Sequence, residues 1–411
     1  MTHPFPLASR PLRLLLLSHS PDDENAGASR IYHMLATGLC ERGHEVDLFH
    51  LEAMGVPREP HLARLAQRTL MPRYLSRFGG RQIGRGYDAV MASSGMAAPL
   101  FARLSRARAR PLLVNHLHGL AIHDHVAAMS EAMLGHGRAS RAARLVTGSL
   151  QAQWDARGVS AADLTIVQNR RDLGDLKERC PGMAVELIAP AVHPQVLAAS
   201  ALAPALDGRA PLLVWFAAWQ PRKGCHYLPG AFRIVRAAHP EARLAIGGTG
   251  GTPADLIDRF AAEDRTAIEV LPRISVADQA ALFGRAAIVV FPSLSEGFGL
   301  ALAEAMCFGL AAVAGSTGFA ADFLCDGRDG RIVPPSSEHI GHAIVDLLDN
   351  PAERSRIAAA GQRIASNLTR DHMISAYERA FRRGRLLPVP VHQPGAQPAD
   401  SLLDSSQLTG V

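Results

Sequence analysis

The sequence predicts an α/β protein built from two doubly wound domains, each with a parallel β-sheet, that face one another across a cleft. At 411 residues the chain is too long for one core of ordinary size, so two domains of roughly 150–200 residues each are expected. Short apolar runs alternate with amphipathic segments, and such strand–helix–strand units enforce a parallel sheet. The composition, with 48% hydrophobic and 20% charged residues, excludes wholesale disorder. No apolar stretch reaches the ~18 residues of a membrane span.

The first domain is expected within residues 1–195. A buried apolar run at 12–17 predicts a strand, and a glycine loop, an amphipathic helix and a second strand near 46–48 follow it. Further short strands are expected at 89–91, 112–114, 164–167 and 185–188.

The second domain is expected within residues 196–372. Residues 194–211 are rich in Ala and Pro and lose periodicity, so they predict a linker. Strands are then expected at 212–216, 244–246, 268–271, 287–291 and 311–314. The Pro-, Ser- and Gln-rich tail, residues 387–411, is predicted to be disordered.

Charge is distributed unevenly along the chain. The formal net charge is +5, and the region Arg58–Arg110 carries eleven arginines against the two acids Glu59 and Asp88. Part of this region reads either as a basic amphipathic helix lying on anionic lipid or as a solvated arginine face, and we hold the two interpretations as equal. No nucleic-acid-binding module accompanies these charges, so no nucleic-acid partner is expected.

Cysteines and histidines give no sign of a metal site or a disulfide framework. The five cysteines are scattered without a CxxC pair, which is typical of buried thiols in a reducing compartment, and a cytoplasmic protein is expected. His116, His118, His123 and His125 crowd together but match no zinc-binding pattern, and the chain has no Asp-x-Asp pair. We therefore expect no metal.

The most informative segment runs from the strand at 288–291 into a glycine loop, Glu296-Gly297-Phe298-Gly299, and then into a helix. Free N–H groups and the dipole at a helix start bind phosphate, and the two glycines let the backbone approach a ligand closely. On one helix, Glu296 and Glu304 would lie ~12 Å apart at 1.5 Å per residue. That distance exceeds the ~5–9.5 Å of a glycosidase acid/base pair but suits the two ends of a long ligand.

A second anion-binding element is Arg222-Lys223-Gly224, which follows the strand at 212–216. Cations near a helix start are electrostatically unfavourable, so their presence there asks for an anion. Lys223 is one of only two lysines in the chain, the other being Lys177. The compact ammonium of lysine suits a diphosphate as a point charge.

Taken in order, these motifs resemble those of the retaining family 4 glycosyltransferases, which have the GT-B fold. Glu296 and Glu304 match the E-x7-E signature of that family. The resemblance covers roughly residues 12–385. Its other motifs are the Gly27 loop, 42–46, His118-Gly119, Lys223-Gly224, 248–250, Pro292-Ser293, and Asp326-Gly327 with Gly330 and Pro334.

The resemblance implies an enzyme that moves a hexose-type sugar from a nucleoside diphosphate sugar to a carbohydrate or lipid-linked acceptor, with anomeric retention and without a metal. Residues 1–195 would face the acceptor, 196–372 would bind the donor, and a helix at 373–386 would cross back to the first domain. The sugar nucleotide would be a co-substrate rather than a cofactor, with the choice between UDP and GDP left open. Surface polysaccharide or glycolipid assembly would be the setting, at the inner face of the cytoplasmic membrane if the basic region binds lipid.

The resemblance also assigns roles to single residues. Glu304 would bond the ribose hydroxyls, and Glu296, with the backbone of Gly297, Phe298 and Gly299 beside it, would contact the donor sugar. Lys223 would neutralise the departing diphosphate. His118 would lie near the donor sugar, and Gly27 would leave room for the phosphates.

The sequence departs from the family pattern where Ala217 and Ala218 stand at the positions of its usual Gly-Arg. Arg222 is the candidate substitute for the lost charge. Two alternatives stay open: a non-catalytic GT-B scaffold or binding subunit, and a nucleotide-sugar epimerase on the same fold.

Overall fold

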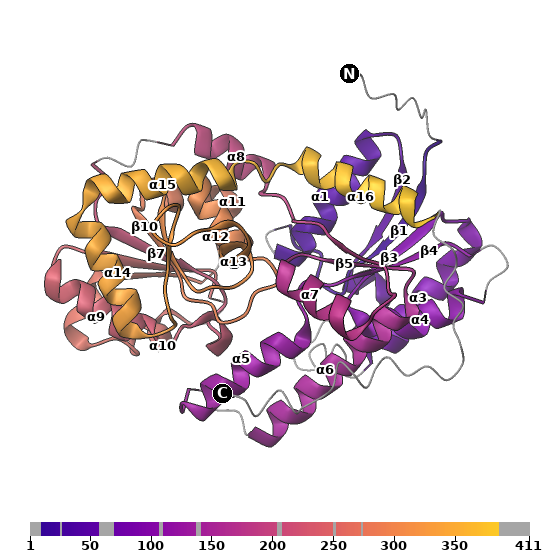
Figure 1. Ribbon diagram of the computed structural model, residues 1–411, viewed down its shortest axis with the longest axis horizontal. Coiled ribbons are helices and arrows are strands. Elements are labelled where there is room, and N and C mark those ends of the chain that lie inside the picture. Colours follow the sequence, from indigo (N-terminus) through magenta and orange to yellow (C-terminus); the bar gives the residue numbers. More distant parts are fainter. Residues whose placement is uncertain are drawn as a thin grey trace.

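The computed structural model describes residues 10–24, 27–56, 70–106, 110–136, 141–203, 208–249, 252–272 and 274–385. Within them the chain forms two lobes, each a six-stranded parallel sheet covered by helices (Figure 1). The predicted fold class, two Rossmann-like domains in the GT-B arrangement, is confirmed.

The first sheet has the strand order β2-β1-β3-β4-β5-β6. Its strands are β1 (Arg13–Leu17), β2 (Glu45–Phe49), β3 (Ala89–Ser93), β4 (Leu112–His116), β5 (Leu164–Val167) and β6 (Val185–Leu187). Its helices are α1 (Gly27–Glu41), α3 (Met71–Gln82), α4 (Ala98–Leu104), α5 (Ala121–Met133), α6 (Arg141–Ala161) and α7 (Arg170–Arg179). Because β1 pairs with β2 on one side and β3 on the other, residues 14–17 are fully buried, which accounts for their unbroken leucine run.

The second sheet has the order β12-β11-β10-β7-β8-β9. Its strands are β7 (Leu212–Phe216), β8 (Arg243–Gly247), β9 (Ile268–Leu271), β10 (Ile288–Phe291), β11 (Ala311–Ala314) and β12 (Arg331–Ile332). Its helices are α9 (Leu228–Ala238), α10 (Pro253–Ile257), α11 (Val276–Arg285), α12 (Leu300–Cys307), α13 (Phe319–Phe323), α14 (Ser337–Asp349) and α15 (Pro351–Ala365). The strands predicted for this half all form, each within one residue of its expected position, and the short β12 was not foreseen.

The expected linker at 194–211 instead begins with a helix, α8 (Pro194–Ala201). Pro194 occupies the first turn of α8, where a backbone N–H would have no partner within the helix in any case. The missing N–H of proline therefore costs nothing there, and this proline-rich segment can begin a helix. Val196 of α8 is buried in the core of the second domain, so the expected boundary at 195/196 falls inside an element of that domain.

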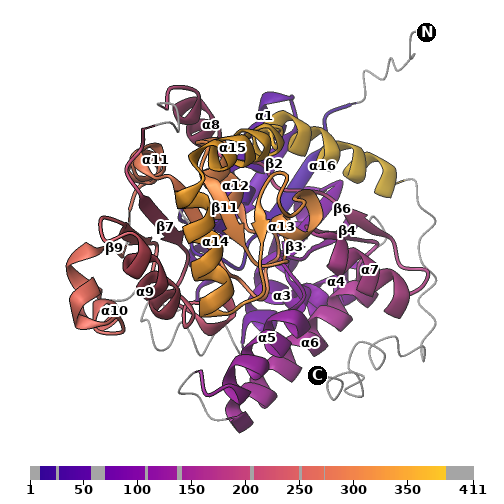
Figure 2. The same ribbon diagram turned by 60° about the vertical axis from the view of Figure 1, so that its left-hand side comes forward.

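The last described helix, α16 (Arg370–Gly384), returns to the first domain. Figures 1 and 2 show it beside α1, and Ile374, Tyr377 and Phe381 are buried in the core of the first domain. The close fit depends on Gly38 of α1, where an added Cβ would lie 2.6 Å from the Ile374 side chain. The end of the predicted crossing helix at 386 and the predicted disordered tail, 387–411, lie outside the described residues.

Among the described residues, no helix combines the length and the apolar character that crossing a bilayer requires. Residues 58–69 and 107–109 of the basic region also lie outside the described residues. The described part contains α3, whose arginines Arg73, Arg77 and Arg81 are exposed while Met71 and Leu75 are buried.

Candidate active site

A cavity of about 1020 Å³ lies between the two domains, where the carboxyl ends of both sheets meet. The loops after β1 and β4 line it from the first domain, and the loops after β7, β8 and β10 line it from the second. Ligands of open parallel sheets bind at this edge, because successive loops there converge on one crevice. Of the residues predicted for the site, all except Glu304 line this cavity: Gly27, His118, Arg222, Lys223, Glu296, Gly297, Phe298 and Gly299.

Lys223 and Glu296 form the charged centre of the cavity. The Nζ atom of Lys223 donates to both carboxylate oxygens of Glu296, each at 2.5 Å. The two side chains are only 13% and 6% exposed, so solvent screens the pair little. Burial lowers the pKa of Lys223, and the adjacent Glu296 carboxylate opposes that shift.

The two glycines of the loop after β10 are required for different reasons, Gly297 by a contact between the domains and Gly299 by its own backbone conformation. A Cβ added to Gly297 would lie 1.7 Å from the carbonyl oxygen of His118, across the cleft. The group that closely approaches Gly297 is therefore the first domain's backbone. Gly299 adopts the left-handed conformation, φ +96°, at the start of α12, which favours glycine. At Gly27, an added Cβ would meet nothing within 4 Å, which leaves open space beside the cavity.

His118 lines the cavity, and its two ring nitrogens differ in their contacts. Its Nδ1 lies 3.1 Å from the amide nitrogen of Gln168, which can only donate, so Nδ1 accepts and Nε2 carries the proton. That Nε2 has no hydrogen-bond partner among the described residues. Burial, together with His116 and His19, lowers the pKa of His118 well below its usual value, so the ring is neutral at pH 7. His118 is thus a neutral N–H donor with its bond unused.

Glu304 lies behind the cavity rather than at its surface. It occupies the second turn of α12 and is 2% exposed. One carboxylate oxygen accepts from the Arg30 guanidinium at 2.5 Å and the other from the Gln279 amide at 2.6 Å. Because Arg30 belongs to α1, this ion pair joins the two domains. Glu296, by contrast, lies in the loop before α12, so the two glutamates do not share a helix.

Arg222 is held at the cavity edge by polar contacts with both domains. Its guanidinium donates to the Ser295 carbonyl at 3.2 Å and lies 3.5 Å from Asp124 of α5. The hydroxyl of Ser295 donates to the same Asp124 at 2.7 Å. Ala217 and Ala218 line the cavity with no charge to offer, so Arg222 and Lys223 are the cations among its described lining residues.

Several residues of the site were missed by sequence reasoning: Arg30, Asp124, Gln168, Asn169 and Gln279. Asn169 illustrates why. It caps α7 by accepting from Asp172, and its amide nitrogen also donates to the Gly297 carbonyl at 2.7 Å. The capping pattern is legible in sequence, but the contact with Gly297 exists only because the two domains meet.

The sequence profile of the glycosyl transferases group 1 family matches residues 203–364. A GDP-mannose-dependent monoacylated alpha-(1-6)-phosphatidylinositol monomannoside mannosyltransferase of Corynebacterium glutamicum is 30% identical over 150 residues, 34% of this chain and 39% of that protein. A D-inositol 3-phosphate glycosyltransferase of Mycolicibacterium paratuberculosis is 36% identical over 163 residues, 38% of this chain and 35% of that protein. The matches thus span less than half the length of these curated relatives.

Among solved structures, the fold is similar to sucrose-phosphate synthase from Thermosynechococcus elongatus, with a TM-score of 0.71. The similarity covers 90% of this chain and 98% of that one. At 18% sequence identity, it supports a shared fold and nothing more. Profile, relatives and fold agree on one assignment. The chain has the GT-B fold, and its residues 203–364 match the glycosyl transferases group 1 family.

Proposed function

We propose that the chain transfers a hexose-type sugar from a nucleoside diphosphate sugar to a carbohydrate or lipid-linked acceptor, with retention at the anomeric carbon. The observation that carries the proposal is the buried Lys223–Glu296 pair at the floor of a cavity lined by both domains. A diphosphate needs a cation beside its departing oxygen, and a sugar needs acceptors for its hydroxyls. This pair offers both at adjacent positions.

The chemistry would proceed by electrostatic stabilisation and positioning. As the bond between the anomeric carbon and the diphosphate oxygen breaks, negative charge grows on the diphosphate, and Lys223 and Arg222 would stabilise it. Glu296 would accept hydrogen bonds from the sugar hydroxyls, and the N–H of His118 would donate to a sugar oxygen. The departing diphosphate would take the proton of the attacking hydroxyl on the same face of the sugar, which yields retention without a protein base.

A non-catalytic scaffold is the second candidate, because Ala217 and Ala218 remove a charge that the family usually places in this cavity. With only Arg222 and Lys223 as described cationic lining, binding of a diphosphate without turnover is the specific alternative. Nucleotide binding and turnover therefore have to be measured separately.

A thermal-shift screen against UDP, GDP, ADP and NAD tests donor binding. At 100 times its dissociation constant, a ligand stabilises the folded protein by roughly 2.7 kcal/mol, a readily visible shift. We expect one nucleoside diphosphate to raise the melting temperature of the parent, and Glu304→Ala to lose that increment relative to its own ligand-free value. Glu338→Ala, at an exposed glutamate of α14, is the matched control and should respond like the parent.

Turnover is then measured as release of that nucleoside diphosphate from its sugar nucleotide. Binding without turnover over a range of sugars and acceptors would favour the scaffold. If no nucleotide shifts the parent, or if Glu304→Ala responds as fully as Glu338→Ala, the assignment of this cavity to a sugar nucleotide is wrong.

We further propose that the described basic helix, α3, rests on an anionic membrane surface, where a lipid-linked acceptor would be presented. Arg73, Arg77 and Arg81 recur every fourth residue, so they share one exposed face of the helix. Beside them a cavity of about 680 Å³ is lined by Arg73, Arg77, Arg103 and Trp154, among others. Each arginine near an anionic bilayer contributes about 1 kcal/mol of attraction.

Co-sedimentation with vesicles tests this surface. The parent is expected to pellet with phosphatidylserine-containing vesicles and not with phosphatidylcholine alone, and the triple change of Arg73, Arg77 and Arg81 to Gln should abolish pelleting. A matched triple change on the second domain, of Arg233, Arg243 and Arg259 to Gln, should leave it intact. Equal losses in both triples would mean that net charge, and not α3, is responsible.

A further inference from the structure

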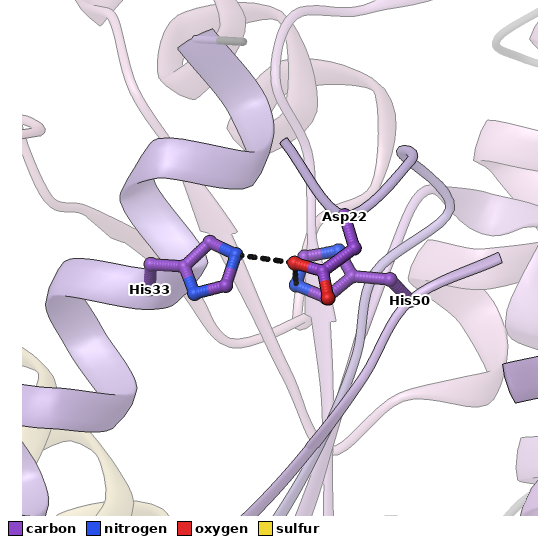
Figure 3. Close-up of side chains that lie close together, drawn as sticks. All are labelled: Asp22, His33 and His50. Atoms are coloured by element: carbon purple, nitrogen blue, oxygen red, sulfur yellow. Dashed lines mark hydrogen bonds and ion pairs between the residues drawn. The ribbon is translucent and has the colours of Figure 1, made fainter. Parts of the chain in front are cut away.

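Three side chains from separate elements of the first domain converge away from the Lys223–Glu296 centre. Asp22 lies in the loop after β1, His33 on the second turn of α1, and His50 directly after β2 (Figure 3). One ligand atom of each lies within 4.8 Å of the other two. The proposed function uses none of these groups.

The buried histidine has an unusual environment. His50 is 5% exposed, and its Nδ1 lies 3.3 Å from the carbonyl oxygen of Ser20. A carbonyl only accepts, so Nδ1 carries the proton and Nε2 holds a lone pair. That Nε2 has no hydrogen-bond partner among the described residues and faces a carboxylate oxygen of Asp22 at 3.7 Å. An acceptor on the buried His50 thus faces an acceptor on the more exposed Asp22, an arrangement that favours a cation between them.

The other groups complete a metal-ligand set. The Nε2 atom of His33 lies 2.8 Å from the same oxygen of Asp22, and the two imidazole rings are stacked with their centres 4.8 Å apart. With metal–ligand bonds of ~2.1 Å, ligand atoms of a tetrahedral zinc ion lie roughly 3.4 Å apart. The two distances to Asp22 bracket that value. The Nδ1 atom of His50 donates to the backbone carbonyl of Ser20, and metal-bound histidines commonly donate their other ring N–H to a carbonyl in this way.

Exposure also fits a site that an ion can enter. The side chains of Asp22, His33 and His50 are 59%, 25% and 5% exposed, so the cluster opens from the buried histidine toward solvent. Two imidazoles and one carboxylate match zinc and its neighbours among the divalent transition metals, whereas magnesium prefers oxygen ligands and octahedral geometry.

We propose that Asp22, His33 and His50 bind one zinc-class divalent transition metal ion, with a fourth position open to water. The ion would tie the loop after β1 to α1 and to the end of β2. Asp23, the next residue of that loop, lines the cavity between the domains, so the ion would order one wall of it. This proposal revises the expectation that the chain holds no metal, and it does not depend on the proposed function.

Calorimetric titration of the chelator-treated, untagged full chain tests the site. ZnCl2 is expected to bind the parent with one ion per chain, and MgCl2 is not. Asp22→Asn and His33→Ala should each weaken zinc binding at least about tenfold, since even outer-shell changes weaken metal binding 10- to 100-fold. His342→Ala removes an exposed histidine of α14 and is the matched control, with parental affinity expected.

Two further readouts separate ligation from a structural effect. Added Co²⁺ should give the parent the intense visible absorption of four-coordinate cobalt, and zinc should slow amide exchange in residues 18–24. Both effects should be absent in Asp22→Asn and His33→Ala, which alter positions open to solvent and should fold in chelator as the parent does. Absence of zinc binding by the parent, or parental affinity in both variants, would overturn the site.

Discussion

Lys223→Met is expected to lower the rate of nucleoside diphosphate release from the sugar nucleotide by about 100- to 1,000-fold, the usual effect of removing one preorganised group that stabilises transition-state charge. The expectation rests on position. The Nζ atom of Lys223 is held by both oxygens of Glu296 at 2.5 Å, so the ammonium is fixed before any donor arrives. The assay uses the nucleotide that gives the thermal shift, at saturating donor, so that the turnover rate is read.

Lys177→Met is the matched control, because Lys177 is the only other lysine and is exposed on α7. It should turn over at the parental rate. Lys223→Met could also lose activity because the protein is destabilised, since the change leaves the Glu296 carboxylate, 6% exposed, without its partner. Breaking such a buried pair costs about 3–5 kcal/mol of stability.

The double variant Lys223→Met/Glu296→Gln separates the two effects. It removes both charges, so it should recover most of the lost stability while the turnover rate stays low. Turnover of Lys223→Met within tenfold of the parent would contradict the role given to this lysine. Full recovery of turnover in the double variant would show instead that the single variant fails by misfolding.

Sequence alone predicted the elements whose signals are local. The runs at 212–216 and 311–314 are strands at the expected residues, because strands buried on both faces are continuously apolar. Helix α8 was missed since Pro194 reads equally as a breaker and as the first residue of a helix, and only the burial of Val196 against the second domain decides between them.

The same distinction divides the site. Glu296, Gly297 and Gly299 were predictable because strand, glycine loop and helix follow one another along the chain. The reason why residue 297 must be glycine could not be predicted, because the atom that a side chain there would strike belongs to His118 of the other domain. Likewise, no sequence feature near Glu304 indicates that Arg30 is its ion-pair partner. Long-range ion pairs follow from how the domains meet, and periodicity carries no information about that.

Arg30→Met is expected to lower the free energy of unfolding by about 3–5 kcal/mol, measured by denaturant titration. The Arg30 and Glu304 side chains are 7% and 3% exposed, so the substitution leaves a buried carboxylate whose one side-chain partner among the described residues is the Gln279 amide. Arg42→Met, at the turn residue directly after the same helix, is the matched control. Its pair with Glu378 is 30% and 23% exposed, and such pairs contribute about 0–1 kcal/mol.

The same variant tests what Glu304 is for. Arg30 holds the carboxylate in one orientation, and each carboxylate oxygen keeps a second lone pair that a ribose hydroxyl can use. If Arg30 positions Glu304 for the nucleotide, Arg30→Met should weaken nucleoside diphosphate binding at least about tenfold, roughly 1.4 kcal/mol, at a temperature where both proteins are folded. If the pair must open before the nucleotide enters, the substitution should tighten binding instead. Weakened binding that Arg30→Met/Glu304→Gln does not restore, although its stability recovers, would identify Glu304 as a ligand of the nucleotide and Arg30 as the residue that positions it.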